Sequence, residues 1–226
     1  MTTDTYTLWA VVRRDPAGGA AAPTTPATPT TTAVAEFEDV IAALPGAAEL
    51  RGIYDVSALK ADADLLFWLH GPTAEGLQAA WRALRGTRLL ADTAPTWNAM
   101  GLHREAEFSR DHVPAFVRGV EPRGWLCVYP FVRSREWYLL PAEERRAMLA
   151  EHGRAGAGFQ VLTNTVAAFA LGDYEWVVPL EADDPAELVD LMRALRYVGA
   201  RRHVVLETPF FTGRRIAAAE AAEVLG

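Results

Sequence analysis

Two side chains in the second half of the chain, His152 and Tyr129, are of types that carry chemistry in many proteins. Residues 141–153 (PAEERRAMLAEHG) predict a helix, on which His152 shares the apolar face of Met148 and Leu149. A histidine on an apolar face is most often a hydrogen-bonded core residue. It can also be a neutral metal ligand or a catalytic base, and both interpretations stay open on the spacing alone.

Tyr129 lies on a predicted strand, residues 125–131 (WLCVYPF), where it alternates with Trp125, Cys127 and Phe131 on one face. A tyrosine in such a position usually packs in the core and directs its hydroxyl to a backbone partner. A catalytic tyrosine would need a cofactor or substrate beside the same face. The strand pattern is compatible with both.

Further candidates lie in the predicted loops on either side of this strand. His112 stands in SRDHVPAF just before Pro114, where a helix is disfavoured. It is either a solvated surface residue or a general base at the mouth of a cavity. Arg133, Arg135 and Trp137 follow the strand, and their pattern is typical of a charged loop anchored by one aromatic side chain.

The charge balance argues against one large class of partner. The 226 residues carry a formal net charge of −7, and no run of Lys and Arg stands clear of neighbouring acids. Nucleic-acid binding requires a basic face, so no nucleic-acid partner is expected. The arginines instead gather locally, which suits the carboxylates of a small molecule. These local groups are Arg133 and Arg135, Arg145 and Arg146, Arg201 and Arg202, and Arg214 and Arg215.

Cysteine usage and hydropathy indicate the compartment. Cys127 is the single cysteine, so no intrachain disulfide can form and no Cys/His zinc spacing exists. The N-terminal MTTDTYTLWAVVRR lacks the layout of a signal peptide, and no apolar run is long enough to cross a bilayer. We therefore expect a cytoplasmic protein with no membrane partner. The glycine-rich GRAGAG at 153–158 follows a helix rather than a strand, which argues against a dinucleotide site.

The order of the predicted elements repeats once along the chain. The expected strands are residues 6–13, 50–56, 64–70 and 96–103, then 125–131, 161–171, 174–181 and 202–207; the expected helices are 34–44, 73–84, 141–153 and 184–195. The low-complexity residues 15–33 predict a mobile loop. Two consecutive βαββαβ units predict an α+β fold of two ferredoxin-like modules, residues 1–110 and 111–226. Face-to-face pairing of their sheets would form a dimeric α+β barrel within one chain and enclose a cavity.

Three segments together resemble a known family. WLCVYPFVRSREWYLLPAEERRAMLAEHG (125–153), NTVAAFALGDYEW (164–176) and ETPFFTG (207–213) are similar to the chlorite dismutase-like superfamily, and within it to the coproheme decarboxylases of the actinobacterial type. The resemblance covers nearly all of the chain outside 15–33. The sequence departs from the family at GRAGAGFQV (153–161), where relatives more often carry a Gly-Arg and a tyrosine.

The resemblance implies roles for individual residues. The histidine of the helix-ending His-Gly is the proximal iron ligand of the family, which is His152 here, and the tyrosine of Tyr-Pro is the redox-active residue, which is Tyr129. A distal histidine precedes a Val-Pro-Ala-Phe stretch, and His112 matches it. Arg133 and Trp137 would line the propionate side of the pocket. Arg201 or Arg202 would hold another propionate.

The implied activity is decarboxylation of two propionates of Fe-coproporphyrin III (coproheme), which is both substrate and cofactor, with hydrogen peroxide as the oxidant and haem b as the product. The family's porphyrin lies in the C-terminal module, and its subunits usually form a homopentamer. Two other functions stay open: chlorite dismutation on haem b, which in relatives goes with a distal arginine, and a non-catalytic haem carrier or sensor. A barrel protein that binds no haem is the simplest alternative.

Overall fold

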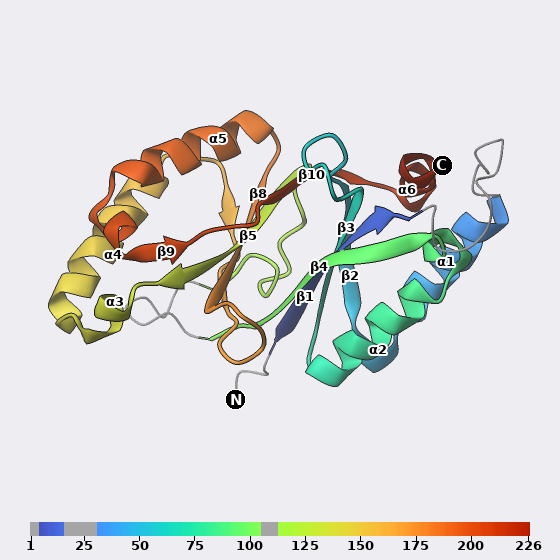
Figure 1. Ribbon diagram of the computed structural model, residues 1–226, viewed down its shortest axis with the longest axis horizontal. Helices are drawn as coiled ribbons and strands as arrows, with labels where there is room; N and C mark the ends of the chain where they lie inside the picture. The colour runs from blue at the N-terminus through green and yellow to red at the C-terminus, as the bar shows by residue number, and fades with distance from the viewer. Residues whose placement is uncertain (1–4, 16–30, 105–112) are drawn as a thin grey trace. The chain divides into compact units, whose positions relative to one another are not determined.

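The computed structural model describes residues 5–15, 31–104 and 113–226 (Figure 1). The chain divides into two compact units, one made of Met1–His103 with Phe211–Gly226 and the other of Arg104–Phe210. The second unit thus begins near the expected boundary at 110/111. The last segment of the chain, expected in the second module, belongs to the first unit because its strand pairs there. No helix among the described residues is long and apolar enough to span a membrane.

The first unit has the predicted βαββαβ order. Its elements are β1 (Tyr6–Arg14), α1 (Thr31–Ala42), β2 (Glu49–Asp55), β3 (Leu65–Gly71), α2 (Ala74–Arg85), β4 (Thr93–Leu102), β10 (Phe211–Ile216) and α6 (Ala218–Leu225). The strands are antiparallel in the order β4-β1-β3-β2-β10. Thr73 caps α2 as expected, because its hydroxyl accepts a hydrogen bond from the Gly76 N–H at 3.1 Å. The loop predicted at residues 15–33 extended too far at its C-terminal end, because α1 begins at Thr31.

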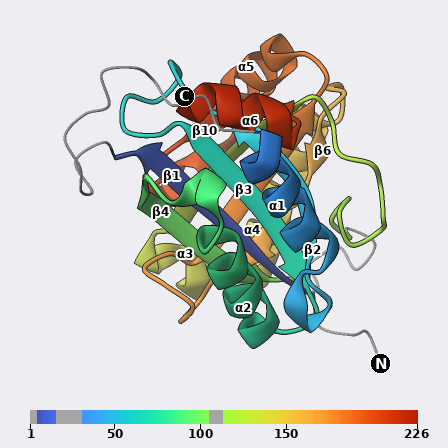
Figure 2. The same ribbon diagram turned by 90° about the vertical axis from the view of Figure 1, so that its right-hand side faces the viewer.

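Three helices cover one face of this sheet. Alternate strand residues such as Leu65, Phe67 and Leu69 pack with apolar residues of α1, α2 and α6 in one cluster. Figure 2 shows these helices lying in front of the strands. On the other face, the fully buried Trp68 donates its indole N–H to the Thr7 hydroxyl at 2.7 Å. The amphipathic patterns read from the sequence therefore account for the core of this unit.

The second unit repeats the same order with two interruptions. Its elements are β5 (Trp125–Arg133), α3 (Arg135–Leu139), α4 (Ala142–Gly156), β6 (Leu162–Thr163), β7 (Val166–Ala167), β8 (Trp176–Ala182), α5 (Pro185–Ala194), the 3₁₀ turns η3 (Leu195–Tyr197) and η4 (Gly199–His203), and β9 (Val204–Leu206). β8 and β9 pair with opposite edges of β5, and β6 and β7 both pair with β8. Helices α4 and α5 run along the same side of β5 and β8 (Figure 1).

The second unit differs from the sequence prediction in four places. The strand expected at 161–171 is split into β6 and β7, because the intervening Asn164 turns its side chain into the interior. The loop after β5 forms the short helix α3 instead. The helix α4 does not end at Gly153 but continues to Gly156. The last strand starts at Val204 because the residues before it form η4.

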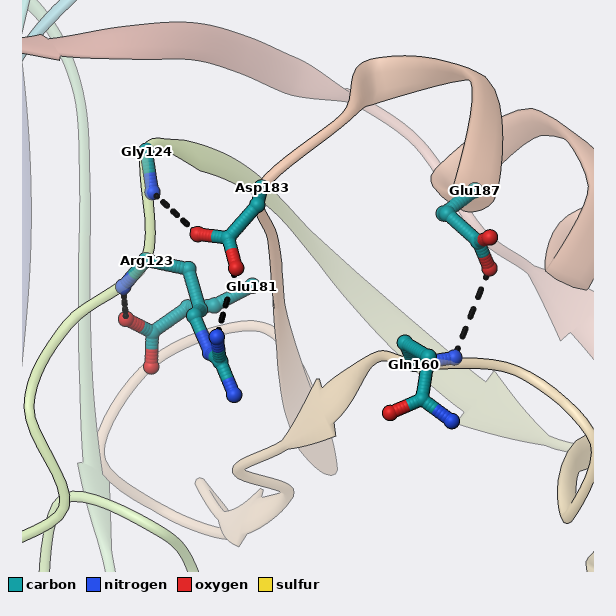
Figure 3. Close-up of polar contacts among 6 residues, drawn as sticks. All are labelled: Arg123, Gly124, Gln160, Glu181, Asp183 and Glu187. Atoms are coloured by element: carbon teal, nitrogen blue, oxygen red, sulfur yellow. Dashed lines mark hydrogen bonds and ion pairs between the residues drawn. The ribbon is translucent and has the colours of Figure 1, made fainter.

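A buried polar network stabilises the interrupted strand. Asn164 and Glu181 have no exposed surface, and the Asn164 amide donates to Glu181 Oε1 at 2.9 Å. Asn164 Oδ1 accepts the Phe116 N–H at 3.0 Å, and Glu181 Oε2 accepts the Arg123 N–H at 3.2 Å. Figure 3 shows that the neighbouring Asp183 also holds this segment, because its carboxylate forms an ion pair with the guanidinium of Arg123. One buried amide and one buried carboxylate thus fix the chain that leads into β5.

We expect Asn164→Ala to destabilise the protein by about 3 kcal/mol, because it removes one buried hydrogen bond from the Glu181 carboxylate and another from the Phe116 N–H. Chemical denaturation monitored by tryptophan fluorescence would measure the loss. The exposed Asn98 provides a matched control, and Asn98→Ala should change the free energy of unfolding by no more than about 0.5 kcal/mol. Equal effects of the two substitutions would contradict the stabilising role of the network.

Candidate functional site

Tyr129 lies in the interior of the second unit, on the face of β5 that is turned toward α5. Its side chain is 7% exposed and its ring stacks on that of Phe210, with 4.4 Å between the centroids. The hydroxyl donates to Met192 Sδ at 3.6 Å. Burial, and then the proximity of Cys127 and Glu207, raises the pKa of the phenol above its ordinary value. The phenol is therefore held neutral and protonated.

Arg133, at the end of the same strand, is held from three sides. Its backbone N–H donates to Glu175 Oε2 at 2.7 Å, and its Nη1 donates to the Ala200 carbonyl at 3.1 Å. The guanidinium carbon lies 4.3 Å from the centroid of the Trp137 ring and 5.0 Å from that of Phe131. Burial lowers the pKa of the guanidinium, which still stays charged at neutral pH. The structure thus brings Arg133 and Trp137 into direct contact.

Helix α3 supplies the support for this cation. Trp137 is buried, and its ring also contacts that of His203, with 5.5 Å between the ring centroids. The Ser134 N–H, at the start of α3, donates to the His203 carbonyl at 2.9 Å. The short helix therefore links the end of β5 to η4. The sequence prediction of a loop at this position missed this link.

His152 lies on a helix that buries no residue. The side of α4 formed by Arg145, Met148, Leu149 and His152 is half-buried, and none of its side chains belongs to the apolar cluster between α5 and the sheet. Most helices are stabilised by packing of one face, so this face is incompletely covered by protein. Glu151 Oε2 accepts the Gly199 N–H at 2.8 Å and attaches α4 to η4.

The imidazole of His152 is suited to be a metal ligand. It has no hydrogen-bond partner among the residues that the structure describes, and burial followed by the positive charge of Arg133 lowers its pKa. A neutral imidazole is therefore favoured at neutral pH. One histidine is a sufficient protein ligand for a metal that brings its other ligands with it, as haem iron does. The apolar, half-covered side of α4 fits the flat face of such a group.

The remaining sequence candidates have different outcomes. Arg201 forms an ion pair with Glu207, with 2.8 Å between Nη1 and Oε2, whereas Arg202 is exposed and has no ion pair within the described parts of the chain. The structure thus brings Arg201, and not Arg202, to the side of the unit that carries Tyr129. His112 lies outside the described residues. The sequence prediction missed Met192, Phe210 and Glu207 as neighbours of Tyr129; of these, only Phe210 and Glu207 lie in a segment, 207–213, that the resemblance had marked.

Fold and site together define an α+β protein of two ferredoxin-like modules, in which one module combines a half-buried histidine on a helix, a buried tyrosine and a fixed arginine. A family model described as chlorite dismutase matches residues 30–216. The chain belongs to the chlorite dismutase family, as the resemblance had indicated.

Relatives and solved structures agree with this assignment. The chain is 55% identical over 169 residues to the coproheme decarboxylase of Mycolicibacterium smegmatis, covering 74% of this chain and 73% of that protein. It is 30% identical over 176 residues to the coproheme decarboxylase of Thermus thermophilus, covering 72% and 70%. A crystal structure of a variant chlorite dismutase from Candidatus Nitrospira defluvii has a TM-score of 0.83 at 21% identity, covering 100% of this chain and 96% of that one. The predicted α+β fold of paired ferredoxin-like modules is thereby confirmed.

We expect Arg133→Gln to raise the pKa of His152 in the protein without porphyrin, because the substitution removes a nearby positive charge that disfavours the imidazolium. An NMR titration of the His152 ring would measure the shift. Arg135→Gln removes the same charge from the exposed start of α3 and should leave the titration unchanged. Identical His152 titrations in the parent protein and Arg133→Gln would show that the two groups are not coupled.

Proposed function

We propose that this protein is a coproheme decarboxylase, which converts two propionates of Fe-coproporphyrin III to vinyl groups and yields haem b, with hydrogen peroxide as the oxidant. The observation that carries the proposal is the presence, in one unit, of a protonated buried tyrosine, a fixed arginine and a neutral imidazole on a half-buried helix face. The 55% identity to the M. smegmatis enzyme supports the same function.

The stoichiometry sets the demands on the protein. Each propionate loses carbon dioxide, one proton and two electrons when its two methylene carbons become a vinyl group. The two electrons and two protons reduce one peroxide to two waters, so each round consumes one peroxide and one net proton. Coproheme would supply the redox chemistry through its own iron, and the protein would orient it and handle protons.

Tyr129 is proposed as the group that removes a hydrogen atom from the propionate. A neutral phenol can give up an electron and a proton together, and its radical can then take hydrogen from a carbon centre within contact distance. The raised pKa keeps the phenol in the neutral form that this step needs. Stacking on Phe210 and the contact with Met192 fix the ring, so its oxygen would be held at one position relative to the substrate.

Arg133 is proposed to bind the carboxylate of a propionate, with Trp137 as its support. The contacts with Ala200 and Trp137 fix the guanidinium before substrate arrives, which limits the entropy lost on binding. Misplacing a reacting atom by an ångström can slow a reaction about a hundredfold, so this preorganisation bears directly on rate. Of the two further arginines predicted from the sequence, the ion-paired Arg201 is the better candidate for another propionate than the exposed Arg202.

Two histidines complete the proposed site. His152 would bind the iron from the side of α4, with the neutral ring that its environment favours. By the family resemblance, His112 is proposed as the base that would accept a proton from peroxide and return it to the departing oxygen. The resemblance is also the basis for proposing a homopentamer, whereas a cytoplasmic location is proposed from the cysteine usage.

Tyr129→Phe should bind coproheme normally but convert it at least about a hundredfold more slowly, because the phenyl ring lacks the hydrogen that the reaction uses. Mass spectrometry of the porphyrin after peroxide titration would measure conversion. Tyr197 is strongly exposed, so Tyr197→Phe is the matched control and should form haem b at the parent rate. Vinyl formation at the parent rate by Tyr129→Phe would exclude the proposed role.

The same assay separates the alternative functions. Loss of two carboxyl groups from coproheme in the parent protein supports the decarboxylase. An unchanged porphyrin contradicts it, and oxygen release from chlorite on addition of haem b would then indicate a dismutase, whose fold this chain shares. Bound but unreactive porphyrin without oxygen release would indicate a carrier or sensor.

His152→Ala should alter the absorption spectrum of the ferric coproheme complex, since the iron loses its proposed protein ligand, and added imidazole should restore it by entering the space left by the ring. Optical titration with and without imidazole measures both effects. His70→Ala, in the first unit, provides the control and should leave the spectrum unaltered. An unaltered spectrum in His152→Ala would move the iron site elsewhere.

A further inference from the structure

A cluster of three charged residues, Glu207, Arg196 and Arg201, lies beside Tyr129, and neither Glu207 nor Arg196 has a role in the function proposed so far. Glu207 is 15% exposed and forms ion pairs with two arginines. Its Oε2 is 2.9 Å from Arg196 Nη1 and 2.8 Å from Arg201 Nη1, and its Oε1 accepts a hydrogen bond from Arg196 at 3.1 Å. A single carboxylate thus lies between two guanidinium groups in a largely buried position.

Two separate parts of the chain place this cluster next to the tyrosine. Arg196 lies in η3, directly after α5, and follows Met192, the acceptor of the Tyr129 hydroxyl, by four residues. Glu207 precedes Phe210, on which the Tyr129 ring stacks, by three residues. The charges of Glu207, Arg196 and Arg201 all influence the pKa of Tyr129, as expected from groups at short range.

The cluster has unused capacity for anions. Two cations share one anion, and each guanidinium offers five N–H donors. The buried Nη1 of Arg201 makes no well-aligned hydrogen bond within the described residues, so its contact with Glu207 is ionic without the geometry of a good hydrogen bond. A second carboxylate would find one net positive charge and free donors, but it would have to share both arginines with Glu207.

We propose that Glu207 is an internal carboxylate that competes with a reacting propionate of the substrate for Arg196 and Arg201. This inference rests on the proposed function and names a specificity-determining residue for it. A propionate whose methylene carbons reach the Tyr129 oxygen lies within the range of the adjacent guanidinium groups. Its carboxylate draws them partly away from Glu207, at a cost in binding free energy.

The competition for the two arginines ends when the propionate has reacted. Once the propionate has become a vinyl group, no substrate anion remains at the cluster, and Glu207 recovers both ion pairs. The carboxylate therefore weakens the binding of the four-carboxylate substrate more than it weakens that of a two-carboxylate product. Glu207 thus sets the ratio of substrate affinity to product affinity, a property distinct from the rate of decarboxylation.

The test compares the binding of two metal-free porphyrins, coproporphyrin III with four carboxylates and protoporphyrin IX with two, by quenching of tryptophan fluorescence without peroxide. Glu207→Gln should tighten the binding of coproporphyrin by about tenfold, with a much smaller change for protoporphyrin, because only the former brings an anion to the freed arginines. Asp190→Asn removes the same charge from an exposed position of α5 and should change neither dissociation constant. Weaker or unchanged coproporphyrin binding, or equal tightening for both porphyrins, would overturn the proposal.

A second variant guards against loss of folding. Arg196→Gln removes one cation and leaves Glu207 paired with Arg201, so it should weaken coproporphyrin binding and affect protoporphyrin less. An opposite or equal effect on the two porphyrins would also overturn the proposal. Thermal unfolding of each variant identifies any that is not folded. Conversion of coproheme by the parent protein is measured separately, so failure of the proposed activity and failure of the Glu207 competition give different results.

Discussion

The position of the Arg133 guanidinium is the constraint on which the rest of the candidate site depends. Strand β5 carries Arg133, α3 supplies the aromatic ring against which the guanidinium packs, and η4 supplies the carbonyl that accepts its hydrogen bond. Because Glu151 attaches α4 to the same turn, the helix that carries His152 is positioned by the same group of contacts. A change at any one of these elements would therefore be transmitted to both the imidazole and the cation.

Burial shifts the pKa values of the two proposed reactive groups in opposite directions. Desolvation lowers the pKa of His152 and raises that of Tyr129, and both effects favour the neutral form. The positive charge of Arg133 strengthens the effect on the imidazole. Arg201 and Arg196 oppose the effect on the phenol, while Glu207 supports it. The imidazole and the phenol, the proposed metal ligand and hydrogen donor, are thus kept uncharged although several charged side chains lie close by.

The sequence predicted the repeated element order because each amphipathic segment carries its own periodicity and its own end signals, such as Thr73 and the Asp184-Pro185 pair that begins α5. The family resemblance predicted His152, Tyr129 and Arg133 as site residues from local motifs. Contacts distant in sequence could not be predicted in this way: the Tyr129 hydroxyl meets a methionine 63 residues away. The choice between Arg201 and Arg202 was also beyond local pattern, since a 3₁₀ turn decides which of two adjacent arginines faces Glu207.

Helix α4 differs from the other long helices of the described chain in having no buried residue. For the proposed function, this means that the order of the helix and the occupancy of the site are thermodynamically linked. A ligand seated on its apolar side would supply the packing that the protein lacks there, and would stabilise the folded unit in proportion to the logarithm of its concentration. Chains that have not received porphyrin would open first at this helix, so local unfolding would mark them for proteolysis ahead of loaded chains.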